Sequence, residues 1–191
     1  MYVEHVKKVQ VVSMNKKHTQ HSGCLDPDQW ASRRKSISRS LLKWYHSTAR
    51  DLPWRRSPDP YRVWVSEIML QQTQVERVKD YFLRFVTKFP TVFDLAGADE
   101  AVVLKYWEGL GYYRRARQLH AAAKLIVSDY EGIFPQDACA LRKLPGVGRY
   151  TAGAIASISF DLPEPILEAN SRRVLARFIH YDTPLSGNKD D

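Results

Sequence analysis

The sequence predicts an all-α fold, and three observations support this prediction. Apolar residues recur at the spacing of an amphipathic helix through most of the chain from about residue 36 onward. Short loops that contain proline or glycine separate these periodic runs, and neither a hairpin signal nor sustained strand alternation interrupts them. The 191 residues are 44% hydrophobic and 12% aromatic, which suffices for one domain with a packed core.

The elements follow from the N-terminus in order. Residues 1–30 are polar without a sustained period, and we expect a basic, disordered extension there. Helical spacing begins near Ser36, and a proline-rich loop follows over residues 51–62. A helix is predicted over residues 63–72, because four residues share one of its faces: Val65, Ile68, Met69 and Gln72.

Further helices complete the series, each bounded by a proline, a glycine or a short polar loop. They are expected at 75–89, 102–110 and 114–130, just before Pro145, just after Gly148, and from about 170 to 179.

The net charge of +8 suggests a polyanionic partner such as nucleic acid. Residues 1–40, however, hold eight lysines and arginines against three acids, so most of the excess lies in the expected extension. The charge by itself therefore leaves nucleic-acid binding and ordinary surface charge equally open.

Composition also argues against several classes of protein. Cys24 and Cys139 are too few and too far apart for a disulfide framework or a metal-ligand cluster, and we expect two idle thiols and no metal site. No apolar run approaches the roughly 20 residues that span a bilayer, and the N-terminal residues lack the apolar core of a secretory signal. We expect a cytoplasmic protein.

The stretch "LPGVGR" predicts a tight turn between two short helices. Gly146 and Gly148 give the turn backbone angles that other residues avoid, and backbone N–H groups at the next helix N-terminus can bind an anion. Arg142, Lys143 and Arg149 flank the turn, so a nucleic-acid phosphate fits it. An ordinary helix–helix turn is the alternative, but the basic surroundings favour phosphate binding.

Several long strings carry a family resemblance. They are "LPWR" (52–55), "WVSEIMLQQTQV" (64–75), "FPTVFDLA" (89–96), "WEGLGYYRRAR" (107–117) and "LPGVGRYTAGAI" (144–155). In order and spacing they resemble the A/G-specific adenine DNA glycosylases, the MutY-like members of the helix-hairpin-helix base-excision glycosylases. The resemblance covers roughly residues 40–185.

This resemblance implies a fold and an activity. The fold would be a six-helix barrel over residues 61–180 with the helix-hairpin-helix at 138–158. Residues 31–60 would supply one helix and a loop of an incomplete second domain, and 181–191 a truncated tail. The activity would be monofunctional hydrolysis of the N-glycosidic bond of adenine mispaired with 8-oxoguanine or guanine in double-stranded DNA. A monomer in the bacterial cytoplasm at the nucleoid, or in a eukaryotic nucleus, would carry it out.

Breaking this bond calls for an acid on the base side and a carboxylate on the sugar side. Glu67 matches the family's acid, and it is a lone acid among apolar neighbours, where desolvation raises a carboxyl pKa. Tyr150 stands where related strand-cleaving enzymes carry a Schiff-base lysine, so no lyase step is expected. Glu168 and Asn170 match the sugar-side residues.

Other matched positions would contact DNA. Trp54 and Arg55 match residues near the adenine pocket, and Gln71, Gln72 and Tyr112 match residues that wedge into the duplex. A core aromatic is the alternative for Tyr112. Gly146, Gly148 and Arg149 would hold a phosphate.

The sequence departs from the family in two respects. Glu168 replaces an aspartate and Ala169 a glycine, which lengthens the sugar-side carboxylate by one methylene. The four cysteines that hold the family's [4Fe–4S] cluster, and a C-terminal domain that reads 8-oxoguanine, have no counterpart in the sequence. We therefore expect an N-terminal fragment with an exposed apolar surface around Leu41 and Trp44.

Three alternatives remain open. An endonuclease III-like glycosylase/lyase is opposed by Tyr150. A lesion-binding fragment disabled at Glu168 would keep the hairpin and the wedge. A fragment without an independent fold would show no helical signal.

Overall fold

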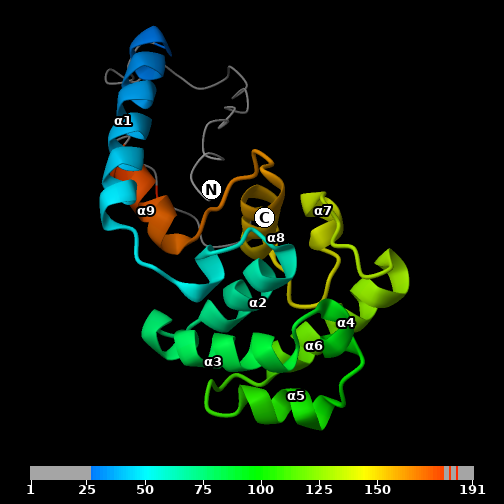
Figure 1. Ribbon diagram of the computed structural model, residues 1–191. Helices are drawn as coiled ribbons and strands as arrows, with labels where there is room; N and C mark the ends of the chain where they lie inside the picture. Colours follow the sequence, from blue (N-terminus) through cyan, green and yellow to red (C-terminus); the bar gives the residue numbers. More distant parts are fainter. Residues whose placement is uncertain (1–26, 179–180, 182–183, 185–191) are drawn as a thin grey trace. The chain divides into compact units, whose positions relative to one another are not determined.

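A computed structural model describes residues 27–178, Tyr181 and Pro184, and every regular element in these residues is a helix (Figure 1). The predicted all-α class is thereby confirmed for this part of the chain. Two compact units divide it, one whose described residues end at Asp51 and one whose described residues begin at Leu52. The expected extension lies, up to residue 26, outside the described residues, and so does most of the expected tail. The expected domain limits stay predictions.

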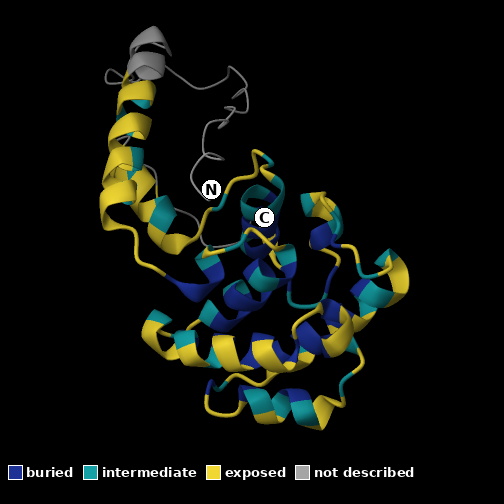
Figure 2. Ribbon diagram, viewed as in Figure 1, coloured by how far each residue is buried: buried dark blue, intermediate teal, exposed yellow. Residues whose placement is uncertain are grey.

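The first unit contains helix α1 (Pro27–Thr48). It begins at Pro27 and not near Ser36, because proline is tolerated in a first helical turn, where its missing N–H needs no partner. The residues before Ser36 carry no apolar period that would have marked this turn. Leu41 and Trp44 are 58% and 60% exposed, so the expected apolar surface on this helix is confirmed (Figure 2).

The second unit opens with a short 3-10 helix, η2 (Pro53–Arg55), and helix α2 (Pro60–Leu70). Asp59 caps α2 by accepting a hydrogen bond from the Arg62 N–H at 2.8 Å. The prediction that this helix runs to Gln72 is wrong. It ends at Leu70, and Gln72 takes a left-handed conformation with φ of 55°, which a helix cannot contain.

Three of the next four helices correspond to predicted helices: α3 (Val75–Lys88), α5 (Glu100–Trp107) and α6 (Arg114–Tyr130). The limits predicted for the second of them, 102–110, are wrong: α5 begins at Glu100 and ends at Trp107, before Gly109, whose φ is 96°. Between α3 and α5 lies α4 (Val92–Ala96), which the apolar period does not reveal because it is one turn long. A capping box marks its start: the Thr91 hydroxyl oxygen accepts from the Asp94 N–H, and the Asp94 carboxylate accepts from the Thr91 N–H.

The chain continues through α7 (Ala138–Leu141), α8 (Arg149–Phe160) and α9 (Ala169–Phe178). α7 and α8 pack together across the turn at residues 142–148 and form the predicted helical hairpin. Residues 152–156 of α8 are all buried, and α8 packs closely on α2. Small side chains in this stretch bring the two helices together.

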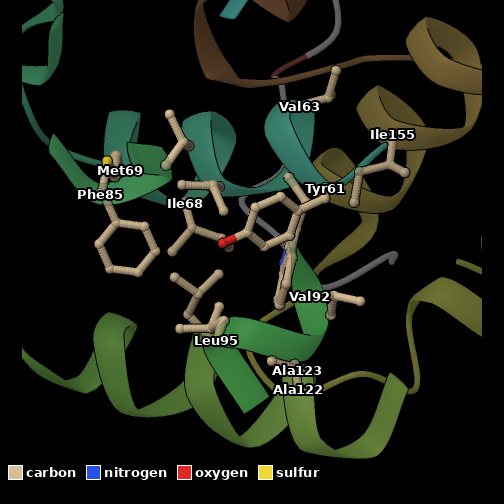
Figure 3. Close-up of a cluster of buried hydrophobic side chains, with 14 of the residues drawn as sticks. Tyr61, Val63, Ile68, Met69, Phe85, Val92, Leu95, Ala122, Ala123 and Ile155 are labelled. Carbon is tan, nitrogen blue, oxygen red and sulfur yellow. The ribbon is translucent and has the colours of Figure 1, made fainter. Parts of the chain in front are cut away.

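Helix α2 lies at the centre of the second unit. It packs against α3, α6 and α8, and Figure 3 draws its apolar side chains together with buried side chains of α3, α4, α6 and α8. The Tyr61 hydroxyl donates a hydrogen bond to the Phe89 carbonyl at 2.7 Å, which ties the start of α2 to the end of α3. The buried hydroxyl group of Tyr61 thus has a hydrogen-bond partner, and α2 becomes a rigid support for the residues near its C-terminus.

Across the described helices, none is both long enough and apolar enough to cross a bilayer.

Candidate active site and DNA interface

Glu67 lies in the last turns of α2, between the buried residues Ser66 and Ile68. Burial raises the pKa of its carboxyl group above the ordinary value, and the negative charge of Glu168 raises this pKa further. A hydrogen bond from Tyr150 and the positive charge of Arg55 oppose the shift. The upward direction of the pKa shift that the apolar neighbours predict is thereby confirmed.

Tyr150 stands at the start of α8, and its side chain reaches Glu67 on α2. Burial raises the pKa of the phenol, and the charges of Glu67 and Glu168 raise it further. The hydroxyl group therefore stays protonated and donates its hydrogen bond to Glu67. A phenol cannot form a Schiff base, so this side chain can orient a carboxyl group but cannot act as a lyase amine.

Glu168 and Asn170 flank the start of α9. The Glu168 N–H donates to the Ser171 hydroxyl at 2.8 Å, the Ser171 hydroxyl donates back to the Glu168 carbonyl at 3.1 Å, and this pair begins the helix. Asn170 Nδ2 donates to Glu168 Oε1 at 3.4 Å and its Oδ1 accepts from Arg173. The Glu168 carboxylate is exposed but close enough to influence Glu67 and Tyr150.

A glycine sets how closely the segment before Glu168 approaches α8. A Cβ atom added at Gly153 would lie 2.6 Å from the Pro165 carbonyl oxygen, closer than atoms normally approach. The segment 161–168 thus runs against the backbone of α8, one turn beyond Tyr150. This contact helps to bring Glu168 near Glu67.

The backbone conformation predicted for the two glycines of the turn is found at Gly146 but not at Gly148. Gly146 has φ of 75°, and its Cα faces the Gln118 side chain, so a glycine is required there. Gly148 has φ of −84° and ψ of −179°, an extended conformation open to any residue, so the prediction of a special conformation is wrong here. It occupies the N-cap of α8, and a Cβ would meet nothing within 4 Å. Gly148 leaves open space before the helix N-terminus.

Arg149 is the first residue of α8, and it is exposed. Arg142 and Lys143, at the beginning of the turn before it, are also exposed. The backbone N–H groups of the first turn of α8 have no intrahelical partners. A positive helix end with cationic neighbours suits a phosphate group.

Gln71, Gln72 and Tyr112 come together as expected. They line one open pocket of about 650 Å³ with three residues of α6: Arg114, Arg115 and Gln118. Tyr112 is 62% exposed, so the alternative of a core aromatic is wrong. Both Gln72 and Tyr112 have positive φ, at 55° and 47°, which projects their side chains from sharply turned loops.

Trp54 and Arg55 lie at two different depths. Trp54 is 5% exposed and packs edge-on against Phe82 with ring centroids 5.5 Å apart, so it belongs to the core. Arg55 is half-buried, and its charge lowers the pKa of Glu67. Of these two residues, Arg55 faces the candidate active site.

Arg115 is the residue that sequence analysis missed. It is 8% exposed and donates hydrogen bonds to carbonyls of α2 and of the loops that carry Gln72 and Tyr112. Burial lowers the pKa of its guanidinium group, while Tyr112 opposes the shift. The available signal was its spacing: Arg115 lies one helical turn before Leu119, on the face of α6 that is buried.

The residues present do not fit the iron–sulfur cluster that the resemblance implies. Such a cluster needs four cysteine thiolates, whereas the sequence has two, of which Cys139 is free and exposed and Cys24 lies outside the described residues. Within the described ranges, no group of three or more histidine, cysteine or acidic side chains could hold a metal ion. No step of a reaction is therefore assigned to the cluster.

In comparison with known proteins, the chain is similar to adenine DNA glycosylases. Over 151 residues the chain is 49% identical to an adenine DNA glycosylase of Rattus norvegicus, covering 74% of this chain and 29% of that protein. It is 45% identical over 140 residues to an adenine DNA glycosylase of Buchnera aphidicola subsp. Baizongia pistaciae, covering 73% of this chain and 40% of that protein. The chain thus spans less than half the length of these relatives.

A solved structure of a thermostable thymine-DNA glycosylase has the same fold. The TM-score is 0.72 at 31% identity, and the match covers 78% of this chain and 69% of that one. A non-covalent endonuclease III–DNA complex matches with a TM-score of 0.64 at 23% identity, over 75% of this chain and 66% of that one, which supports the fold. The family described as HhH-GPD superfamily base excision DNA repair protein matches residues 65–186. The chain belongs to the HhH-GPD superfamily of base excision DNA repair proteins.

Proposed function

We propose that this chain carries the catalytic part of a monofunctional adenine DNA glycosylase. Its substrate is adenine mispaired with 8-oxoguanine or guanine in double-stranded DNA. The observation that carries the proposal is the buried Glu67 carboxyl group, whose pKa is raised by burial and which accepts a hydrogen bond from Tyr150. The relatives to which the chain is similar are named adenine DNA glycosylases, which supports adenine as the base that is released.

The reaction follows from the two carboxyl groups. Glu67 donates its proton to a ring nitrogen of the extruded adenine, so that the base departs as a neutral molecule. The N-glycosidic bond breaks, and its electrons leave with the base. Positive charge develops on the sugar, where the carboxylate of Glu168 stabilises it. A water molecule adds to the sugar carbon and returns a proton to Glu67.

Neighbouring residues support this chemistry in different ways. Tyr150 orients the Glu67 carboxyl group and offers no amine, so the reaction ends at an abasic site with the strand intact. Asn170 holds the Glu168 carboxylate through its Nδ2–Oε1 contact of 3.4 Å. Arg55 adds positive charge beside the acid, which limits the rise of its pKa.

DNA is held at two places. The N-terminus of α8, with Gly146, Gly148 and Arg149, binds a phosphate of the backbone. The loops that carry Gln71, Gln72 and Tyr112 enter the duplex at the mispair. We propose that the protein acts as a monomer on DNA, at the nucleoid of a bacterial cytoplasm or in a eukaryotic nucleus.

One observation favours a second function, a lesion-binding protein with impaired catalysis. Glu168 has a longer side chain than the aspartate of the family, and its carboxylate is exposed and engaged by Asn170. A carboxylate displaced by about 1 Å costs on the order of a hundredfold in rate. DNA binding at the hairpin and wedge would survive such a defect.

The test is a single-turnover assay on a duplex with adenine opposite 8-oxoguanine, treated with alkali to reveal abasic sites. The chain and its Glu168→Asp variant are compared after their helical content has been matched by circular dichroism. Release by the unaltered chain supports the glycosylase. Release by the variant alone identifies the lesion-binding alternative, and release by neither, with both folded, refutes the proposal. Strand cleavage without alkali would indicate a lyase.

A further inference from the structure

The guanidinium group of Arg115 holds the C-terminal end of α2. Its Nη1 donates to the carbonyls of Ile68 and Met69, both at 3.0 Å, and to the carbonyl of Gln71. The last carbonyls of a helix have no intrahelical partner, and a positive charge is favoured at this end of the helix dipole. Arg115 therefore fixes the point at which α2 ends and the chain turns toward Gln72.

The second nitrogen reaches a different part of the chain. Nη2 donates to the Thr73 hydroxyl at 3.2 Å and to the carbonyls of Gly111 and Leu110 at 3.4 and 3.5 Å. The guanidinium carbon also lies 5.4 Å from the centre of the Tyr112 ring. One buried side chain thus connects residues 71–74, called the first wedge loop, with residues 108–113, called the second wedge loop.

Each wedge loop has a strained residue at its exposed tip. Gln72 and Tyr112 adopt φ of 55° and 47°, in the left-handed region that costs about 1 kcal/mol or more for residues other than glycine. Such conformations persist only where the surroundings hold them. Arg115 bonds to carbonyl groups directly beside both residues, at Gln71 and at Gly111.

We propose that Arg115 is a positioning residue that locks the two wedge loops into one arrangement, so that Gln72 and Tyr112 meet the mispaired duplex together. This inference rests on the proposed function and concerns the selection of the mispair before any chemistry. Its physical basis is the fork of the guanidinium group, which serves two carbonyls of α2 and four acceptors on the two wedge loops at once. A lysine ammonium at the same place has three donors and no planar fork, so it cannot hold both loops.

The locking is tested first without DNA. Amide hydrogen exchange is measured on the full chain, its Arg115→Lys variant and its Arg117→Lys variant. Arg117 is a matched control because it lies on the same helix, is exposed, and its side chain pairs with Glu100 at 3.3 Å on the surface. Arg115→Lys is expected to raise exchange in both wedge loops by about tenfold or more, with the core of α2 and α6 unchanged. Faster exchange in one loop alone, or in neither, overturns the inference.

A second variant keeps this test decisive if Arg115→Lys does not fold. Thr73→Val removes one acceptor of Arg115 and the hydroxyl group's own hydrogen bond to the Gln71 carbonyl, both on the first wedge loop. Because the guanidinium group is shared, exchange is expected to rise in the second wedge loop as well. A response confined to residues 71–74 overturns the inference.

The consequence for DNA is tested with a duplex that cannot be cleaved, containing 2′-fluoro-adenosine opposite 8-oxoguanine, beside a matched A:T duplex. Fluorescence anisotropy is expected to show about tenfold weaker binding of Arg115→Lys to the mispair, with A:T affinity within about twofold of the unaltered chain. In a Tyr112→Ala background, the same change is expected to cost less than about twofold, because Arg115 acts through that loop.

Each outcome has a separate meaning. A full tenfold cost in the Tyr112→Ala background, or a mispair preference unchanged in Arg115→Lys, overturns the positioning role while the proposed function stands. If the unaltered chain binds both duplexes equally, the proposed function fails, and the role of Arg115 in selecting the mispair fails with it. The exchange measurement then still decides whether Arg115 locks the loops.

Discussion

The two carboxyl groups of the site lie in regions that are built differently. Glu67 belongs to α2, where most residues are buried and where the helix packs against α3, α6 and α8. Glu168 precedes α9, a helix with no buried residue in the described part of the chain. Three large apolar side chains of α9 are about half exposed or more: Val174, Leu175 and Phe178.

Glu67 and Glu168 thus illustrate two ways of positioning a carboxyl group. The environment of Glu67 is produced by the core, so its proton affinity is as secure as the packing around it. The place of Glu168 depends on local hydrogen bonds from Ser171 and Asn170 and on the contact of Pro165 with Gly153. Substitutions at Glu67 should therefore act through chemistry, whereas substitutions around Glu168 should act through local geometry.

The largest effect is expected for Glu67→Gln. Glutamine fills the same space but cannot donate a carboxyl proton, so single-turnover release of adenine should fall by about 10²- to 10⁴-fold. The control is Glu131→Gln, an exposed change at the C-cap of α6 that should leave the rate unaltered. Equal rates for Glu67→Gln and the unaltered chain would remove Glu67 from its assigned role.

Gly153→Ala tests the geometric side of the comparison. The new methyl carbon would lie 2.6 Å from the Pro165 carbonyl oxygen, so the segment 161–168 must shift. We expect a loss of about 1–3 kcal/mol in the free energy of unfolding and a fall in adenine release that exceeds the loss of folded protein. Urea unfolding and the single-turnover assay measure the two effects. Ser157→Ala, on the same helix, controls for substitution of a small residue. Unchanged release would show that the contact does not position Glu168.

The sequence predicts the buried side of the molecule better than the exposed side. The helix over 114–130 is found with the same limits, because its apolar period is long and glycine precedes it. The convergence of Glu67, Tyr150 and Glu168 came from the resemblance, since the three residues lie on different elements and no local pattern joins them. Local spacing could assign each residue to its own element, but it could not show that the three residues approach one another.

What the sequence did not predict depends on contacts between distant residues. The end of α2 at Leu70 has no glycine or proline to mark it, and the left-handed Gln72 is held by Arg115, more than forty positions later. Gly148 was read together with Gly146, but only Gly146 faces a packed neighbour, Gln118. Helix α4 did have a sequence signal, because the spacing of Thr91 and Asp94 is that of a capping box. A search for apolar periodicity does not detect this signal.

A smaller effect is expected on stability as the pH changes. Burial raises the folded-state pKa of Glu67 above its ordinary value of 4.5, so the folded state binds more protons than the unfolded state between these two pKa values. The stabilisation is full below pH 4.5 and is lost as the pH rises through the folded-state pKa. Relative to Glu67→Gln, the melting temperature of the unaltered chain should therefore fall by a few degrees as the pH rises from 4 to 8. Parallel curves for the two proteins would contradict a buried, proton-holding Glu67.

The smallest effect is expected on α9, and it sharpens the contrast between the two regions. Val65 on α2 is 0% exposed and Val174 on α9 is 64% exposed, so the same substitution can be made on both sides. Val65→Ala should lower the free energy of unfolding by about 2 kcal/mol, whereas Val174→Ala should change it by less than about 0.5 kcal/mol. Urea unfolding measures both. A cost at Val174 close to that at Val65 would mean that α9 is packed in solution, and Glu168 would then be held as firmly as Glu67.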